Sequence, residues 1–299
     1  MRLIDSHCHL QSERFAADVD DVVAAAISAG LERILVPGWN GWSSEAALAL
    51  VERHPWLDAA VGIHPHDAAR VDDAGWAAIV RDSADPRVVA IGETGLDYDR
   101  VFSPIADQTV NLRRNLALAL ETGKPAILHV RSAAGRRDAQ DALLAELRAA
   151  GFGGASVAAA FGERPSALIH SFSGPVDFAR AALDLGLAIS ISGLAFRHGE
   201  EPTAEVTALV PDDRLLVETD SPYLSPPGGP KGRNAPEWVR ITAAWVAAQR
   251  GVSGEAGLAA TGLALVASYD RVFPRAGRPP LPDVPANMDE PAHQAEGTA

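Results

Sequence analysis

Eight short apolar runs, separated by longer amphipathic stretches, constrain the fold of this chain more than any other feature of its sequence. The runs occupy residues 3–6, 33–36, 58–62, 88–92, 126–130, 167–171, 188–192 and 215–218. Continuous apolar strands that alternate with helices are typical of a parallel sheet buried on both faces. Eight strand–helix units close a (β/α)8 TIM barrel, so we predict that α/β fold. The alternative is an open doubly wound sheet, but no glycine-rich phosphate fingerprint follows the first run.

The stretches between the runs show the helical spacing of apolar residues. They cover residues 16–29, 43–53, 74–82, 108–122, 137–150, 176–185 and 204–209, and two more, 235–249 and 256–272, follow the last run. Segment 151–165 is rich in glycine and alanine, and we expect an inserted loop with room for a short helix.

The length of 299 residues fits one barrel of roughly 250 residues and a tail better than two domains. We predict a barrel domain over residues 1–274. Residues 275–299 are rich in proline and alanine and carry few large apolar side chains. Such a segment cannot bury enough apolar surface to offset the entropy of ordering, so we predict a disordered tail.

The charge balance limits the possible partners. The chain has 26 basic and 39 acidic residues, a net charge of −13, which argues against a broad basic surface for nucleic acid but not against a small site for a strand end. The single cysteine, Cys8, excludes an intramolecular disulfide and a four-cysteine zinc module. No signal-peptide pattern and no apolar run of ~20 residues is present, so we expect a cytoplasmic protein without membrane contact.

Titratable side chains gather at the C-terminal ends of the predicted strands, where TIM barrels form their active sites. Six of the nine histidines lie there, together with a glutamate and an aspartate; the candidates that the argument uses are His7, His9, Glu93, His129, His170 and Asp220. His7 and His9 point to the same side because side chains alternate along a strand. Burying four imidazoles and two carboxylates together is costly unless a divalent metal ion compensates.

The number and type of these groups predict two ions rather than one. Six ligands are too many for one tetrahedral ion but suit two ions that share a bridging carboxylate. Glu93 comes from a strand between those that carry the other ligands, which makes it the natural bridge. The mixed nitrogen and oxygen set favours Zn, Mn, Fe or Co, and Mg²⁺ stays open where a phosphate and waters complete the shell.

The strand ends also carry motifs of a known family, in segments 4–10, 62–66, 90–98, 124–131, 169–174 and 216–224 and in Arg233-Asn234. Over about residues 2–270 the chain resembles the TatD-related metal-dependent deoxyribonucleases, a branch of the amidohydrolase-like barrels. The resemblance implies that His7, His9 and Asp220 hold one ion, that His129 and His170 hold the other, and that Glu93 lies between them. It implies hydrolysis of DNA phosphodiester bonds, commonly as a 3′→5′ exonuclease, with His64 and Arg131 near the substrate.

Several positions leave two interpretations open. Arg131 either pairs with a phosphate in forked geometry or forms a salt bridge to an acid on a neighbouring loop. His64 either contacts a phosphate or orients a ligand carboxylate. Trp39 and Trp42 either pack against helices or stack a base near the pocket mouth. We expect His66 to be structural, Cys8 to be a small buried apolar residue, and Glu218 to be a partner of the site or a paired core acid.

Three departures from the family pattern bear on substrate preference rather than on catalysis. Ser132 follows Arg131 where the family usually has an aspartate, and Asp99 replaces an aromatic residue. Segment 151–165 is longer than the usual connection.

From these features we predict a metal-dependent hydrolase that cleaves DNA at single-stranded 3′ ends with a water activated by two divalent ions, Zn, Mn or Mg. Glu93 and Asp220 are the expected catalytic residues, with Asp220 as ligand and general base. We expect a monomer without an obligate protein partner. The alternatives are a cyclic amide or lactone hydrolase and a metal-retaining scaffold protein. The former often uses a carboxylated lysine as bridge, and neither Lys124 nor Lys231 stands at a predicted strand end.

Overall fold

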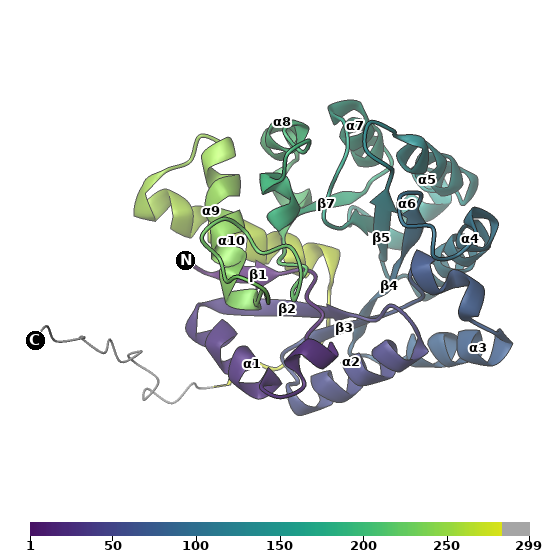
Figure 1. Cartoon of the computed structure of the whole chain (residues 1–299), viewed down its shortest axis with the longest axis horizontal. Helices are drawn as coiled ribbons and strands as arrows, with labels where there is room; N and C mark the ends of the chain where they lie inside the picture. The colour runs from purple at the N-terminus through teal and green to yellow at the C-terminus, as the bar shows by residue number, and fades with distance from the viewer. Residues whose placement is uncertain (283–299) are drawn as a thin grey trace, which may run out of the picture.

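The computed structural model describes residues 1–282 and contains one sheet of eight parallel strands in sequence order, β1 to β8, with helices around its outside (Figure 1). The strands are Leu3–Asp5, Leu31–Pro37, Asp58–Val61, Val88–Asp97, Ala126–Arg131, Ala167–Ile169, Ala188–Ile191 and Leu215–Val217. Each overlaps a predicted run, and the predicted (β/α)8 TIM barrel is confirmed.

The barrel closes where the chain segments after β1 and β8 meet. Ser6 N donates to the carbonyl of Val217 at 3.0 Å, and Asp220 N donates to the carbonyl of His7 at 2.9 Å. An isolated parallel bridge joins Cys8 to Ser221. These contacts hold the residues that follow the first and last strands side by side at the C-terminal end of the barrel.

Ten α-helices surround the strands. They are α1 Val19–Ser28, α2 Gly41–Arg53, α3 Asp73–Asp82, α4 Ile105–Thr122, α5 Asp138–Ala149, α6 Ala155–Phe161, α7 Val176–Asp184, α8 Pro202–Leu209, α9 Val239–Gln249 and α10 Gly254–Val272 among residues 1–282. Two begin three or four residues later than predicted because short 3-10 turns, Glu13–Phe15 and Pro236–Trp238, precede them. The inserted segment 151–165 contains α6.

Local signals explain individual helix ends. The side chain of Asn40 accepts a hydrogen bond from Ser43 N, and the Ser43 hydroxyl contacts the backbone of Asn40, which forms a capping box at the start of α2. Helix α4 ends at Thr122 and is followed by Gly123. The φ of Gly123 is 63°, in the left-handed region that glycine adopts without a steric penalty.

Strand β4 is longer than predicted and is decisive for the site. The expected end at residue 92 was wrong: β4 continues to Asp97 and is buried throughout. Gly92 and Gly95 have φ of 146° and 144°, so they lie in a region that side chains disfavour. A Cβ atom at Gly92 would stand 2.7 Å from the carbonyl oxygen of Ile127, and one at Gly95 would overlap the carbonyl oxygen of His129. The glycines therefore let β4 run close to β5 past the point where the apolar sequence stops.

The segment after α10 differs from the prediction. Arg275 and Arg278 bind the fully buried carboxylate of Asp58 at 3.0 and 2.6 Å, at the N-terminal end of β3. The prediction of a disordered tail from residue 275 was therefore wrong for residues 275–282. Its remainder, 283–299, lies outside the described residues. The paired arginines were not anticipated because a composition rich in proline and alanine gave no sign of a buried partner.

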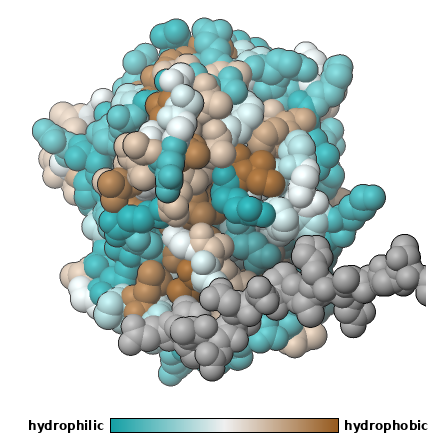
Figure 2. Space-filling view, turned by 90° about the vertical axis from the view of Figure 1, so that its left-hand side faces the viewer, coloured by the Kyte–Doolittle hydropathy of each residue, from teal (hydrophilic) through white to brown (hydrophobic). Residues whose placement is uncertain are grey.

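Surface properties complete the description. Within residues 1–282, none of the helices combines the length and apolar character that crossing a bilayer demands. The face seen in Figure 2 mixes hydrophilic and hydrophobic side chains, with the hydrophobic ones in separate small groups.

Candidate active site

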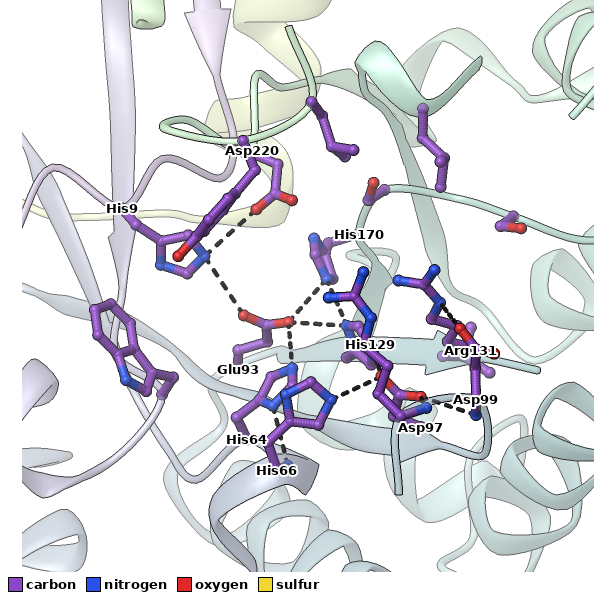
Figure 3. Close-up of a pocket in the computed structure, with 18 of the residues that line it drawn as sticks. His9, His64, His66, Glu93, Asp97, Asp99, His129, Arg131, His170 and Asp220 are labelled. Atoms are coloured by element: carbon purple, nitrogen blue, oxygen red, sulfur yellow. Dashed lines mark hydrogen bonds and ion pairs between the residues drawn. The ribbon is translucent and has the colours of Figure 1, made fainter. Parts of the chain in front are cut away.

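A pocket of about 1130 Å³ lies at the C-terminal end of the barrel, and side chains from six strand ends converge at its base (Figure 3). All six predicted metal ligands come together there. The segment after β1 supplies His7 and His9, β4 supplies Glu93, β5 supplies His129, and the residues after β6 and β8 supply His170 and Asp220.

The carboxylate of Glu93 lies at the centre, with each oxygen facing a different set of histidines. Oε1 is 2.9 Å from His170 Nε2 and 3.1 Å from His129 Nδ1. Oε2 is 3.3 Å from His7 Nε2 and 3.7 Å from His9 Nε2. A single side chain thus touches both halves of the site, as a bridging ligand must.

The half on the Oε2 side also contains Asp220. Its Oδ1 lies 3.4 Å from His9 Nε2 and 3.8 Å from His7 Nε2, and these two nitrogens are 3.2 Å apart. Zinc ligands at roughly 2.1 Å from an ion in tetrahedral geometry stand about 3.4 Å from one another. The separations of these three ligands and Glu93 Oε2 therefore fit one divalent ion.

The other half contains His64, which the sequence did not predict as a ligand. His64 Nε2 is 3.2 Å from Glu93 Oε1, so the imidazole lies against the ligand carboxylate. One ligand atom each from His64, Glu93 and His129 fall within 4.8 Å of one another, as do those of His7, His9 and Glu93. These two groups share Glu93, which is the arrangement expected of two ions with one common carboxylate. A third group, His7, His170 and Asp220, joins a histidine from each half of the site.

The electrostatics of the site also suit cations. Burial opposes the charge on Glu93, but His170, His64 and His7 outweigh it and hold the pKa of that carboxyl well below its usual range. Burial likewise opposes the charge on Asp220, and a hydrogen bond from His9 keeps its pKa low. Burial lowers the pKa of His64 to about 4. Ionised carboxylates beside a neutral imidazole are the protonation states in which these groups bind metal.

Two buried carboxylates behind the histidines fix their orientation. Glu218 lies 3.1 Å from His170 Nδ1, so that Nε2 of the same ring faces Glu93. This confirms the interpretation of Glu218 as a partner of the site. Asp97 Oδ2 lies 3.3 Å from His129 Nε2 and 2.8 Å from His66 Nε2. Such carboxylate–histidine contacts set the tautomer and orientation of metal-binding imidazoles.

Asp97 was not predicted as a residue of the site. The signal that could have found it is its position four residues after Glu93, because alternation along an extended strand places both side chains on one face. The predicted end of the strand at residue 92 hid this relation. His66, which we expected to be structural, lines the pocket, and its Nε2 contacts Asp97 Oδ2.

Other predicted residues take definite places. Arg131 Nε lies 2.9 Å from Asp99 Oδ2, so the predicted salt bridge to a neighbouring loop is present, and Arg131 lines the pocket as well (Figure 3). Cys8 is buried, with its sulfur 2.9 Å from Ser221 Oγ. Lys124 donates to the backbone carbonyls of Ser83 and Asp85, so its amine is used elsewhere.

Basic and aromatic side chains form the rim of the pocket, which is lined among others by Arg14, Trp39, Arg70, Arg100, Phe102, Arg197 and Tyr223. The ring of Trp39 meets His9 edge-on at 5.1 Å, and Trp42 meets Trp39 at 6.0 Å. Trp39 is thus part of the pocket wall, whereas Trp42 is 54% exposed behind it. The lining thus combines aromatic rings with arginines, and the acidic residues Asp67, Asp99 and Glu200 lie among them.

Comparisons with known proteins agree with this geometry. Residues 4–264 match the family model described as TatD related DNase. The 3′-5′ ssDNA/RNA exonuclease TatD of Salmonella typhimurium is 35% identical over 243 residues, 79% of this chain and 87% of that protein. The metal-dependent hydrolase YabD of Bacillus subtilis is 33% identical over 82% of this chain and 90% of its own length. The crystal structure of the TatD homologue YjjV from Escherichia coli superposes with a TM-score of 0.77 at 28% identity, covering 91% of this chain and 98% of that one.

Proposed function

The chain belongs to the TatD-related DNase family of metal-dependent hydrolases, and on that premise we propose that it removes nucleotides from single-stranded DNA in the 3′→5′ direction with two divalent ions. The observation that carries this proposal is the double contact of Glu93, whose two oxygens face two separate sets of ligands. The polarity and the strand preference follow the TatD exonucleases among its relatives.

The ligands divide into two sets. His7, His9 and Asp220 would hold one ion, His129 and His170 the other, and Glu93 would touch both, with His64 beside the second. Zn, Mn and Mg remain the candidate metals, because the set mixes imidazole nitrogen with carboxylate oxygen. Ions bound there supply a hydrolytic nucleophile from water near neutral pH and neutralise charge on the phosphate.

Two residues of the chain have further roles in the reaction. Asp220 is ionised and its side chain is 17% exposed toward the pocket, so its carboxylate can accept a proton from the attacking water. Arg131 is 44% exposed, and Asp99 holds its guanidinium at Nε. The two terminal nitrogens remain available to bind a non-bridging phosphate oxygen, a fork that lysine cannot reproduce.

The other function classes are less consistent with these observations. A carboxylated lysine bridge of a cyclic amide or lactone hydrolase has no candidate here, because Lys124 is bound to backbone carbonyls and Lys231 lies in an exposed loop. A scaffold without catalysis would not need the intact ligand set. We further infer that the enzyme acts as a cytoplasmic monomer.

The test is a metal-resolved assay on single-stranded oligonucleotides that carry a label at the 3′ or the 5′ end, run beside a panel of cyclic amides and lactones. The proposal predicts metal-dependent release of the 3′-terminal nucleotide first, and no turnover of the panel. Release from the 5′ end first would overturn the polarity. Turnover of the panel without DNA cleavage would overturn the assignment as a nuclease.

A further inference from the structure

Loop 98–103, between β4 and α4, presents an aromatic ring and a cation to the pocket without an evident structural reason. Phe102 lines the pocket and is 66% exposed, the largest exposed fraction among the large apolar residues that the structure describes. Arg100 lines the same pocket, and among residues 1–282 no carboxylate lies within ion-pair distance of its guanidinium. An exposed phenylalanine beside an unpaired arginine, both on the pocket lining, suits a ligand that offers a flat ring and an anion together.

The loop is held firmly in place. Asp97 Oδ1 accepts hydrogen bonds from Asp99 N at 3.0 Å and Arg100 N at 2.7 Å (Figure 3 shows the first of these). The side-chain amide of Gln108 donates to the carbonyls of Asp97 and Ser103 at 3.0 and 2.9 Å. Phe102 is therefore exposed on a fixed backbone, which reduces the entropy lost when a ligand binds.

The same contacts connect the loop to the metal centre. Asp97 binds the loop through Oδ1 and contacts the rings of His66 and His129 through Oδ2. The centroid of the Phe102 ring is 4.7 Å from that of His66, which is 6.1 Å from that of His129. Phe102 thus lies two ring-to-ring steps from a predicted metal ligand, within the reach of one nucleotide whose phosphate occupies the centre.

We propose that loop 98–103 forms a nucleotide subsite beside the metal centre, in which the Phe102 ring stacks on an unpaired base and the Arg100 guanidinium binds the phosphate adjacent to the cleaved one. This inference rests on the proposed nuclease function and adds the residues that position the strand. The His66 and Phe102 rings meet nearly perpendicularly, at 82°, in an edge-to-face contact. A base in a duplex has both faces covered by its neighbours, whereas an unpaired base offers a face for stacking.

The experiment measures hydrolysis by the metal-loaded enzyme on a labelled oligothymidylate and on three versions with one abasic residue at the last, second-last or third-last position. The variants are Phe102→Leu, Phe102→Trp and Arg100→Gln. The controls are Val110→Ala, an exposed apolar residue of α4 outside the pocket lining, and Arg148→Gln, which removes an exposed charge from α5.

Phe102→Leu should raise KM for the intact strand about 10-fold with kcat within about 2-fold, since leucine cannot stack on a base as an aromatic ring does. Phe102→Trp should retain the wild-type KM. One abasic position should weaken the wild-type enzyme by a similar factor, and Phe102→Leu should add nothing on that substrate. Arg100→Gln should raise KM and reduce its salt dependence, whereas both controls should match the wild type.

Unchanged KM in Phe102→Leu, or the same loss on intact and abasic strands, would overturn the subsite. The subsite would also be overturned if sedimentation showed that Phe102→Leu forms a smaller oligomer than the wild type while its KM is unaltered. The Phe102 ring would then belong to a contact between protein chains. Fluorescence anisotropy with strands whose phosphorothioate 3′ linkages slow cleavage separates the two proposals. Binding that depends on Phe102 without any hydrolysis would retain the subsite and refute the nuclease. Absence of both would refute both.

Discussion

At the scale of single residues, the chemistry centres on Glu93, because its two carboxylate oxygens face different pairs of histidines. Oε1 faces His129 and His170, while Oε2 faces His7 and His9. In the proposed two-ion site, both ions would need the carboxylate in this position, whereas each histidine would serve one ion. Loss of Glu93 should therefore affect the whole site, and loss of a group behind a histidine should affect one ion.

Glu93→Ala should abolish hydrolysis and lower the metal content, because both ions lose a ligand. Metal per chain is measured by elemental analysis after gel filtration, and turnover on a labelled single strand. Glu205→Ala, which removes an exposed carboxylate from α8, is the control and should retain both. Wild-type turnover in Glu93→Ala would exclude Glu93 as the bridge.

Glu218→Gln should lower the affinity for one of the two ions about 10- to 100-fold, because the amide no longer holds His170 as a carboxylate does. The activity lost at limiting metal should return in part at saturating metal, since the ligands themselves remain. Metal titrations of activity give the midpoint. A midpoint equal to that of the wild type would show that Glu218 does not support the site.

Arg131→Lys should reduce kcat/KM about 10-fold or more while the bound metal stays unchanged, because lysine keeps the charge but not the fork. The Asp99 contact that orients Arg131 at 2.9 Å uses Nε, an atom that lysine lacks. If instead the variant loses metal, the arginine has a structural role in the site.

At the scale of elements, strand β4 shows what the sequence could and could not predict. Its apolar half was recognised, and the positions of Glu93, His129 and His170 followed from the order of strands and the geometry of the barrel. Its continuation from Glu93 to Asp97 was missed, because Gly92 and Gly95 interrupt the apolar pattern and glycine usually weakens a strand. The contact between Asp97 and His66 depends also on the direction of the His66 side chain in the 3-10 helix Pro65–Arg70 after β3, which no periodicity encodes.

Gly95→Ala should destabilise the protein by about 3 kcal/mol or more and reduce activity. The residue has a φ of 144°, and an added Cβ would overlap the carbonyl oxygen of His129, a predicted ligand. Gly41→Ala, at the start of α2 with no atom within 4 Å of the added Cβ, should change stability by no more than about 1 kcal/mol. Denaturant unfolding measures both; equal stability of the two variants would contradict the role given to β4.

At the scale of the whole molecule, the two ends of the barrel have separate tasks. The C-terminal end of the sheet carries the site, and the N-terminal end carries the buried Asp58 with its partners Tyr269, Arg275 and Arg278. The net charge of −13 bears on how the molecule binds DNA. In the proposed two-ion site, two divalent ions would contribute about +4 and offset the negative charge of the carboxylates there, which removes a barrier to a phosphate that the net charge alone would suggest. A strand end is then bound locally, weakly and with strong dependence on salt.

Arg278→Ala should destabilise the fold by about 2–4 kcal/mol and leave kcat/KM per folded molecule unchanged, because it removes one partner of a buried carboxylate far from the pocket. Thermal and denaturant unfolding measure the first effect, and active-site titration the second. Arg148→Ala on α5 is the control and should be neutral. A wild-type melting temperature in Arg278→Ala would mean that residues 275–282 do not stabilise the barrel.

The most direct test of the two-ion site is anomalous diffraction from crystals of the protein loaded with Mn²⁺. We expect two peaks in the pocket, one beside Oε2 of Glu93 within reach of His7, His9 and Asp220, and one beside Oε1 within reach of His129 and His170. A single peak, or two peaks of which one does not contact Glu93, would contradict it.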